Sequence, residues 1–310
     1  MVRCSKCGRE AVTFIRYNGN HLCAQHFQEF VERRVKKELR SQIDLDEAGD
    51  IAVAVSGGKD SCVALAIMRD ITEKRRDVSL RCITVDEGIA GYRPASIKKV
   101  RALCRSLDVE HVVIGFRDEI GMDMDEISGH LGARTPCAYC GVFRRRCMNK
   151  AARTLGVKAL ATGHNLDDTA QAILMNFTRG DVERLARLGP HTKVQPGLIP
   201  RIAPLRQIPE KEAYLYAILR GIDFADATCP YWEAALRNEY RDIIDGMEAR
   251  SPGTRHSILA SYDAVRPLLK QRYPQSTLSL CGCGEPAPTG RCMACNMIEE
   301  LESRNNESDG

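Results

Sequence analysis

The chain has 310 residues, a formal net charge of +4 and 14 cysteines. No apolar run reaches membrane-spanning length and the start lacks the apolar stretch of a signal peptide, so a cytoplasmic protein is expected. Thiols stay reduced in that compartment, which argues against a disulfide framework and directs attention to metal binding or catalysis by the cysteines.

The first 28 residues form a short module with two pairs of metal-binding side chains. Cys4 and Cys7 form one pair, and Cys23 and His26 form the other, each with two residues between its members. This spacing is typical of a structural zinc site, and about 26 residues cannot fold on a core of their own. We therefore expect zinc here, with free surface thiols as the alternative.

The next part of the chain begins with an amphipathic helix at 27–48 and then alternates between predicted strands and helices. This alternation predicts an α/β fold with a parallel sheet that is covered on both faces. Ligands of such sheets bind beyond the carboxyl ends of the strands, where Ser56, Asp86 and Gly163 lie. The strands are expected at 51–55, 80–85, 109–114 and 159–162, and the helices at 60–69, 94–107, 143–155 and 165–177.

A glycine-rich segment, Ser56-Gly57-Gly58-Lys59-Asp60-Ser61, joins the first of these strands to a helix. Adjacent glycines let the backbone approach an anion, and the start of a helix favours negative charge. The spacing is not that of a Walker A loop. Lys59 adds positive charge, and Asp60 is suited to hold Mg²⁺ or to position phosphates. A plain turn with a helix cap is the alternative.

The segment resembles the PP-loop of N-type ATP pyrophosphatases, which cleave ATP to AMP and pyrophosphate and adenylate a substrate oxygen. The resemblance implies the phosphate role for Lys59 and the Mg²⁺ role for Asp60. It also implies a phosphate cradle made by Ser56, Gly57, Gly58 and Ser61.

Two further segments fit the same family. Residues 85–89, with Asp86, match the segment that contacts adenine, and residues 162–168, with Gly163 and His164, match one that contacts ATP. An aspartate of the second segment is implicated in catalysis in that family, and Asp168 is favoured over Asp167. Two acidic residues at the start of a helix are also typical of plain helix caps.

Three central cysteines form a separate group. Cys137 and Cys140 open a helix, and Cys229 follows about ninety residues later. Such a set suits zinc, a redox dithiol, or an iron–sulfur cluster with one open position. The basic run Arg144-Arg145-Arg146 follows directly; it is either a solvated helix face or a contact for RNA phosphates.

The last part of the chain is expected to be helical from Pro209 to about Leu269 and then to form a second cysteine module. Its ligands would be Cys281, Cys283, Cys292 and Cys295, again for zinc, although one residue separates the first pair where two are usual. The expected boundaries are 1–28 for the N-terminal zinc module, 29–48 for the linker helix, 49–235 for the catalytic domain, 236–277 for the helical part, 278–298 for the C-terminal zinc module and 299–310 for a disordered tail.

Together, the PP-loop, the three central cysteines and the terminal modules resemble the tRNA 2-thiouridine synthetases, the group that contains NcsA and TtuA. The resemblance covers residues 1–297 and implies a [4Fe–4S] cluster on Cys137, Cys140 and Cys229, with its fourth iron free to take sulfide. ATP would adenylate O2 of a uridine, and sulfide or a ubiquitin-like thiocarboxylate carrier would then supply sulfur to C2. The partners implied are tRNA, the sulfur donor and a second copy of the chain.

The position modified is expected to be wobble uridine 34, with T-loop uridine 54 as the alternative. A 2-thiocytidine synthetase, a lysidine synthetase and a non-catalytic zinc-ribbon RNA-binding protein also stay open. Some members of the group have a catalytic lysine where residues 141–146 offer only arginines. Cys147 has no role in the family, and Cys62, Cys82 and Cys104 are expected to be small core residues.

Overall fold

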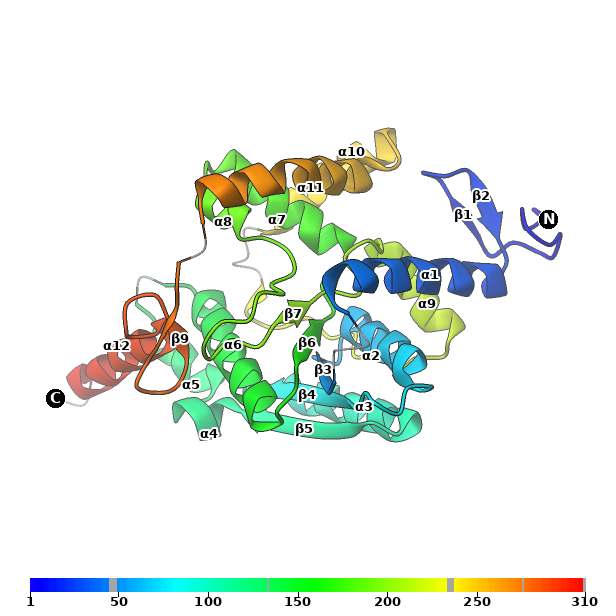
Figure 1. Cartoon of the computed structure of the whole chain (residues 1–310). Coiled ribbons are helices and arrows are strands. Elements are labelled where there is room, and N and C mark those ends of the chain that lie inside the picture. Colours follow the sequence, from blue (N-terminus) through cyan, green and yellow to red (C-terminus); the bar gives the residue numbers. More distant parts are fainter. Residues whose placement is uncertain (45–48, 133, 233–236, 275, 309–310) are drawn as a thin grey trace.

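A five-stranded parallel sheet forms the centre of the computed structural model, which describes the chain except for residues 45–48, 133, 233–236, 275 and 309–310 (Figure 1). The strand order is β5-β4-β3-β6-β7. From β3 the chain adds β4 and β5 on one side of the sheet, and it then returns to add β6 and β7 on the other side of β3. The loops after β3 and β6 therefore run in opposite directions and leave a crevice at the carboxyl edge of the sheet. The bounds are β3 Ile51–Ala54, β4 Leu80–Asp86, β5 Glu110–Gly115, β6 Ala159–Thr162 and β7 Arg201–Ile202.

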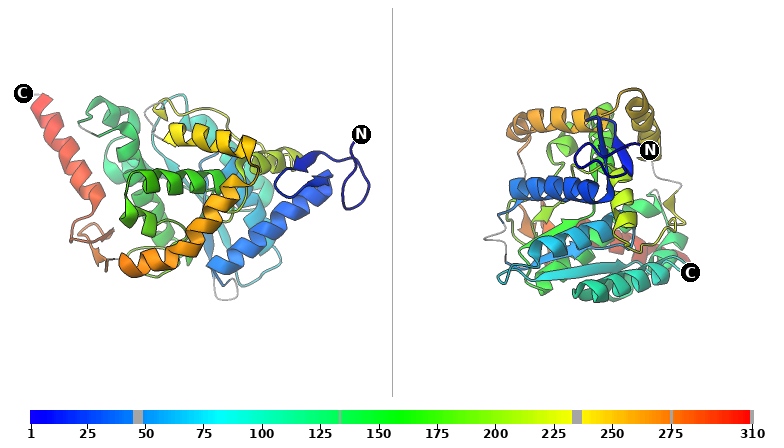
Figure 2. Two further views of the ribbon diagram at one scale, coloured as in Figure 1. Left: turned by 90° about the horizontal axis from the view of Figure 1, so that it is seen from above. Right: turned by 90° about the vertical axis from the view of Figure 1, so that its right-hand side faces the viewer.

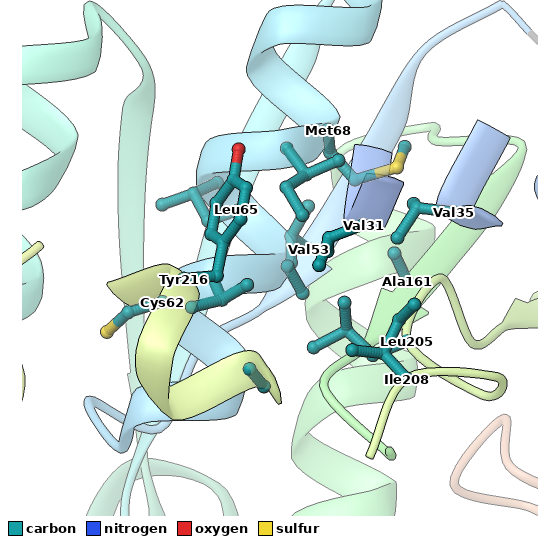
Figure 3. Packing of buried hydrophobic residues seen from close by; sticks show 14 of the residues in the cluster. Val31, Val35, Val53, Cys62, Leu65, Met68, Ala161, Leu205, Ile208 and Tyr216 are labelled. Carbon is teal, nitrogen blue, oxygen red and sulfur yellow. The ribbon is translucent and has the colours of Figure 1, made fainter. Parts of the chain in front are cut away.

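Helices cover both faces of this sheet, as the alternation predicts. Helices α2 (Lys59–Thr72) and α3 (Arg93–Leu107) pack on one face, and α6 (Pro136–Thr154) packs on the other. Helices α1 (Ala24–Gln42) and α9 (Glu210–Leu219) form an outer layer over α2. Figure 3 shows side chains from these layers meeting in the main core, among them Val31, Leu65 and Tyr216.

A group of four helices lies above the carboxyl edge of the sheet (Figure 1). Helix α7 packs against α8, α10 and α11, with Leu166, Leu185 and Leu259 buried among them. The expected helical part 236–277 therefore contacts the sheet domain directly through α7. The bounds are α7 Leu166–Thr178, α8 Val182–Ala186, α10 Arg237–Arg250 and α11 Thr254–Arg272.

The two cysteine modules lie at opposite ends of the molecule (Figures 1 and 2). The N-terminal module is a hairpin of β1 (Thr13–Ile15) and β2 (Asn20–Leu22) attached to α1. The C-terminal module pairs β8 (Ser279–Leu280) with β9 (Pro286–Ala287) and packs with α12 (Met293–Ser308) on α6, beside α4 (Phe116–Ile120) and α5 (Met124–Gly129). Among the described helices, none is both long and apolar enough to cross a membrane.

Three predicted segments differ from the structure. The linker helix ends at Gln42, and the rest of its expected length includes 45–48, which lie outside the described residues. Residues 222–229 are not helical, because Ile222 and Phe224 pack on the core and the N–H of Ala225 donates to the carbonyl of Gly57 over 2.8 Å. The expected disordered tail is helical up to Ser308, since Leu301 is fully buried against α6.

Candidate active site

The loop between β3 and α2 is closed by the hydroxyl of Ser61. It accepts a hydrogen bond from the N–H of Ser56 over 3.1 Å and donates one to the carbonyl of Gly58 over 2.9 Å. Gly57 has φ +94°, and a Cβ there would lie 2.9 Å from the Cβ of Ser96, so this position requires glycine. Among the residues that the structure describes, no side chain caps the start of α2, so its first N–H groups are available to an anion.

Lys59 and Asp60 form an ion pair at the start of α2. The ammonium of Lys59 lies 3.0 Å from Asp60 and 2.6 Å from the carboxylate of Glu210 on α9. Burial acts to lower the pKa of Lys59, but the two carboxylates raise it overall, so the lysine stays charged. Burial raises the pKa of Asp60 to about 6. Its Oδ1 atom is buried and accepts no hydrogen bond from the described residues.

The two aspartates after β6 have different surroundings. Asp168 lines the same cavity as Asp60 and caps α7 together with Asn165. Asp167 is buried away from that cavity, where its carboxylate accepts from Nε of Arg255 over 2.6 Å and from the N–H of Glu210 over 2.7 Å. Of the two, Asp168 therefore lies at the cavity, whereas Asp167 joins α7 to Arg255 on α11 and to the start of α9.

Gly163 brings the end of β6 against the loop after β3. A Cβ at Gly163 would lie 2.7 Å from both the N and the Cα of Ser61. Only glycine at position 163 therefore lets the loop after β6 contact the loop after β3. The expected convergence of these two loops depends on that contact. The neighbouring His164 lines the cavity, and its Nδ1 lies 2.9 Å from the hydroxyl of Thr162.

A cavity of about 720 Å³ opens at this edge of the sheet. Its walls come from the loop after β3, the start of α7, the middle of α6 and the strand β7. Of the expected ATP-binding residues, Ser56, Gly58, Asp60, Ser61, Gly163 and His164 line it, together with Asp168. Lys59 and Asp86 do not line it: the ammonium of Lys59 is bound to Glu210, and the carboxylate of Asp86 accepts a hydrogen bond from the N–H of Gly88 in a turn.

The three central cysteines meet beside this cavity. Cys137 and Cys140 lie in the first two turns of α6, and the thiol of Cys137 is 3.4 Å from the carbonyl of Tyr231, two residues beyond Cys229. Burial raises the pKa of the Cys140 thiol to about 11, and the thiols of Cys229 and Cys137 add to this effect. The three sulfur atoms are not all within 4.8 Å of one another, so this set is wider than the ligand set of a single ion.

Arg144 lies one turn beyond Cys140 and lines the cavity. Its Nε is 3.8 Å from Glu87, a carboxylate that is buried in an ion pair with Arg93. Arg93 in turn donates to the carbonyl of Ser56 over 2.7 Å. This chain of contacts joins the nucleotide loop to the helix that carries the cysteines.

The other two arginines of the basic run 144–146 have different surroundings. Arg145 also lines the cavity, whereas Arg146 reaches the C-terminal module and lies 3.8 Å from the Sγ of Cys295. Cys147 is fully buried against Phe116 and Phe143 in the core beside the C-terminal module.

The terminal cysteine sets have the spacing of single-ion sites. In the N-terminal set, Cys7 and Cys23 are 3.8 Å apart, and the Nδ1 of His26 is 3.4 Å from Cys23. In the C-terminal set, Cys283 and Cys292 are 3.6 Å apart. Sulfur atoms bound to one tetrahedral zinc are about 3.8 Å apart, given a Zn–S bond of about 2.3 Å. The four possible ligands of each set lie within 4.8 Å of one another: Cys4, Cys7, Cys23 and His26, and Cys281, Cys283, Cys292 and Cys295.

Several residues that shape the site carry no signal in the sequence. Glu210 and Arg255 position Lys59 and Asp167 from distant helices, and Arg201 enters the cavity from the short strand β7. None of the three belongs to a recognisable motif, and only the fold brings each of them to the site.

The parallel sheet, the glycine loop at its switch point and the adjoining carboxylates define a PP-loop ATP-binding enzyme. Residues 27–247 match the family model of the PP-loop domain, and residues 3–28 match that of the 2-thiouridine synthetase TtuA N-terminal LIM domain. The chain therefore belongs to the PP-loop tRNA 2-thiouridine synthetase family and is a tRNA sulfurtransferase.

Relatives match over nearly the whole chain. The tRNA 2-thiolation protein NcsA of Haloferax volcanii is 37% identical, over 97% of this chain and all of the relative. The tRNA-5-methyluridine(54) 2-sulfurtransferase of Pyrococcus horikoshii is 30% identical, over 95% of this chain and 93% of the relative. The solved U34-tRNA thiolase NcsA from Methanococcus maripaludis with its [4Fe-4S] cluster is 33% identical, with a TM-score of 0.85 and 97% of each chain covered.

Proposed function

We propose that the chain thiolates wobble uridine 34 of tRNA at C2, using ATP to activate O2. The observation that carries the proposal is that helix α6 presents Cys137 and Cys140 at its start and lines the ATP cavity with its next turns. Activation of an oxygen and delivery of sulfur therefore occur side by side. The likeness to a solved U34-tRNA thiolase, which is 33% identical with a TM-score of 0.85, supports this position.

The first step transfers AMP to the uridine. O2 attacks the α-phosphorus of ATP, the bond to the β-phosphate breaks, and pyrophosphate leaves. The N–H groups at the start of α2 and the side chain of Ser56 hold the phosphates. Asp60 and Asp168 supply the carboxylates for Mg²⁺, which prefers oxygen ligands and bound phosphates. Lys59 must exchange Glu210 for a phosphate oxygen when ATP binds.

The second step replaces the activated oxygen with sulfur, and AMP leaves with that oxygen. The chemistry of the donor set, three thiols on a helix start and a distant loop that leave a fourth iron without a protein ligand, fits a [4Fe–4S] cluster on Cys137, Cys140 and Cys229. When bound, the cluster would supply an iron atom with an open position for sulfide. Arg144 places a positive charge between these thiols and the nucleotide, where negative charge develops on the AMP leaving group.

The remaining cofactors and partners follow from the same chemistry. Zinc is proposed in both terminal sets, because their thiols have tetrahedral spacing. The target uridine must leave its base stack to enter the cavity, as is usual for enzymes that modify a base. Sulfide or a ubiquitin-like carrier with a thiocarboxylate is proposed as the donor, a homodimer as the assembly and the cytoplasm, which keeps 14 thiols reduced, as the location.

The test is an anaerobic reaction of the purified protein with ATP, Mg²⁺, sulfide and unmodified tRNA, analysed by mass spectrometry of the nucleosides. The expected product is 2-thiouridine at position 34, with one AMP and one pyrophosphate released for each. Cys229→Ala should abolish thiolation, whereas Cys147→Ala, a buried cysteine on the same helix as Cys137 and Cys140, should retain it.

Other outcomes would identify the alternatives. A fully active, folded Cys229→Ala variant would contradict the cluster. Thiolation at position 54, 2-thiocytidine or lysidine as the product would each overturn the proposed substrate. tRNA binding with no release of AMP and pyrophosphate would favour a non-catalytic RNA-binding protein.

A further inference from the structure

Five arginines line the ATP cavity, and they differ in their partners. Arg93 is paired with the buried Glu87, and Arg206 is paired with Asp263 and lies 3.5 Å from Glu38. Arg144 lies 3.8 Å from Glu87. The charges of these three arginines are therefore balanced by carboxylates of the protein itself.

Arg145 and Arg201 are not balanced in this way. Among the described residues, neither has a carboxylate within 4.0 Å or a side-chain hydrogen bond, and the buried Nε of Arg201 has no acceptor. The carboxylate that acts on Arg201 from further away is Glu285, which is already held by Arg153 at 2.7 Å. Two guanidinium groups without a carboxylate partner among the described residues thus line one cavity.

The surroundings make this pair costly to the free protein. Burial and the neighbouring Arg145 lower the pKa of Arg201 to about 10. Burial also lowers the pKa of His191, which pairs with Arg201 through the backbone, to about 4, helped by Arg201, Arg266 and Lys270. Cations that repel one another beside a cavity do not stabilise a fold, and such an arrangement is typical of a binding site for an anion.

The position of the pair within the cavity limits which anion it binds. ATP phosphates belong on the loop after β3, whereas Arg201 lies on β7, two strands away and so about 10 Å across the sheet. Arg145 folds back over Gly141, toward the cysteine end of α6. In a nucleotide the ribose separates the phosphate from the base, so a backbone phosphate can reach this pair while O2 of its base reaches the ATP.

We propose that Arg145 and Arg201 bind a backbone phosphate of the target nucleotide and thereby hold its base over the ATP. This inference rests on the proposed transfer of sulfur to a tRNA uridine, and it assigns a binding role to two residues on different walls of the cavity. The chemical class bound is a phosphate diester of RNA, and the ATP triphosphate is the competing source of phosphate.

The test measures binding without the reaction. The variants are Arg201→Gln, Arg145→Gln and Arg201→Lys, with Arg187→Gln as a matched control, since Arg187 is exposed and paired with Glu183 on its own helix over 2.9 Å. The affinity for an unmodified tRNA transcript is measured over a range of salt concentrations, together with the affinity for ATP and the melting temperature.

We expect Arg201→Gln and Arg145→Gln each to weaken tRNA binding about 10-fold and to reduce the salt slope by about one, because one phosphate contact is lost. ATP affinity should stay within about 2-fold, and the melting temperature should be unchanged or higher, because a repelling cation is removed. Arg201→Lys should recover part of the tRNA affinity, and Arg187→Gln should bind within about 2-fold of the original.

An RNA in which one phosphate is replaced by an uncharged linkage tests which phosphate the two arginines bind. An anticodon stem–loop with a methylphosphonate in place of the phosphate 5′ of the target uridine should bind the original protein about 10-fold more weakly, and Arg201→Gln should show no further loss. Weaker ATP binding with unchanged tRNA binding, additive losses, or a lower melting temperature with unchanged affinities would each overturn the inference. The binding assay is separate from thiolation, so a failure of the proposed function would appear instead as tRNA binding without a thiolated product.

Discussion

Asp60 is a residue at which stability and activity oppose each other. Its carboxylate is only 23% exposed, and burial raises its pKa from the ordinary value of 3.8 to about 6. A shift of about two pKa units corresponds to at most about 3 kcal/mol, because one unit is about 1.36 kcal/mol. We predict that Asp60→Asn stabilises the nucleotide-free protein by about 1–3 kcal/mol at pH 7.5 and abolishes pyrophosphate release with Mg²⁺ and ATP.

The raised pKa of Asp60 also predicts how the gain in stability from Asp60→Asn changes with pH. The folded protein holds the proton of Asp60 more tightly than the unfolded chain does, so this carboxyl group lowers stability as the pH rises from about 4 to 6. The gain from Asp60→Asn should therefore be full above pH 7 and vanish toward pH 4 in urea unfolding curves. The pKa of Asp50 is lowered by its hydrogen bond to Ser79, so Asp50→Asn should change stability in the opposite direction. A constant gain at all pH values would contradict the prediction.

Gly163 shows how a single absent side chain sets the shape of the site. An added Cβ would lie 2.7 Å from the backbone of Ser61, and backbone atoms cannot move aside as the end of a long side chain can. We predict that Gly163→Ala costs about 1–3 kcal/mol of stability and weakens ATP binding at least about 10-fold. Calorimetry would measure both effects.

The control for this substitution is another glycine. Gly246 lies within α10, where an added Cβ would meet only the end of the Arg250 side chain at 3.8 Å. Gly246→Ala should therefore stabilise the protein by about 0.5–1 kcal/mol and leave ATP binding unchanged. Equal effects of the two substitutions on stability and ATP binding would show that the close contact of Gly163 with Ser61 does not determine either property.

At the scale of elements, the pair of Glu87 and Arg93 connects β4, α3 and the nucleotide loop. Both side chains are 3% exposed. Arg93→Met leaves the buried Glu87 carboxylate with only the more distant Arg144 at 3.8 Å and should cost about 3 kcal/mol, whereas the double variant Arg93→Met with Glu87→Gln should recover most of that loss. Thermal unfolding measures the recovery. ATP binding should stay weak in both variants, because the hydrogen bond to the carbonyl of Ser56 is lost.

The elements that the sequence predicts well are those with strong local signals. The strand at 159–162 has the bounds of β6, and the strands of the other long apolar runs agree with β3, β4 and β5 to within a residue at each end. Strand β7 has only two residues and no apolar run, so it carries no such signal. The helix predicted through residues 222–229 is absent, because contacts with the core and with Gly57 hold this segment in a non-helical conformation.

The site follows the same division. The loop 56–61, Gly163 and Asp168 belong to contiguous motifs, and the cavity lining includes residues from all three. Arg201 reaches the cavity only because β7 adds to the sheet beside β6, and Glu210 reaches Lys59 only because α9 packs on α2. Tertiary contacts between distant segments determine these positions, and no local pattern encodes them.

At the scale of the whole molecule, the two cysteine modules stabilise different parts of the site. The C-terminal module is bound to α6 through Glu285. The carboxylate of Glu285 accepts a hydrogen bond from the side-chain amide of Asn149 over 3.1 Å and forms an ion pair with Arg153, and both partners lie on α6. The N-terminal module instead extends into α1, whose Arg34 pairs with Glu212 on α9 over 2.7 Å. Metal loss at one end should therefore affect the sulfur site, and metal loss at the other should not.

Cys7 and Cys283 form a matched pair for this prediction, since each is the exposed cysteine of its set. We expect both Cys7→Ser and Cys283→Ser to lose about one zinc per chain by elemental analysis, because a thiolate ligand is removed. Cys283→Ser should also lower the iron content after anaerobic reconstitution and slow thiolation, since the helix that presents Cys137 and Cys140 loses its support. Cys7→Ser should keep its iron content. Equal iron content in the two variants would show that α6 holds the cysteines in place without the C-terminal module, and iron loss confined to Cys7→Ser would reverse the assignment of the two ends.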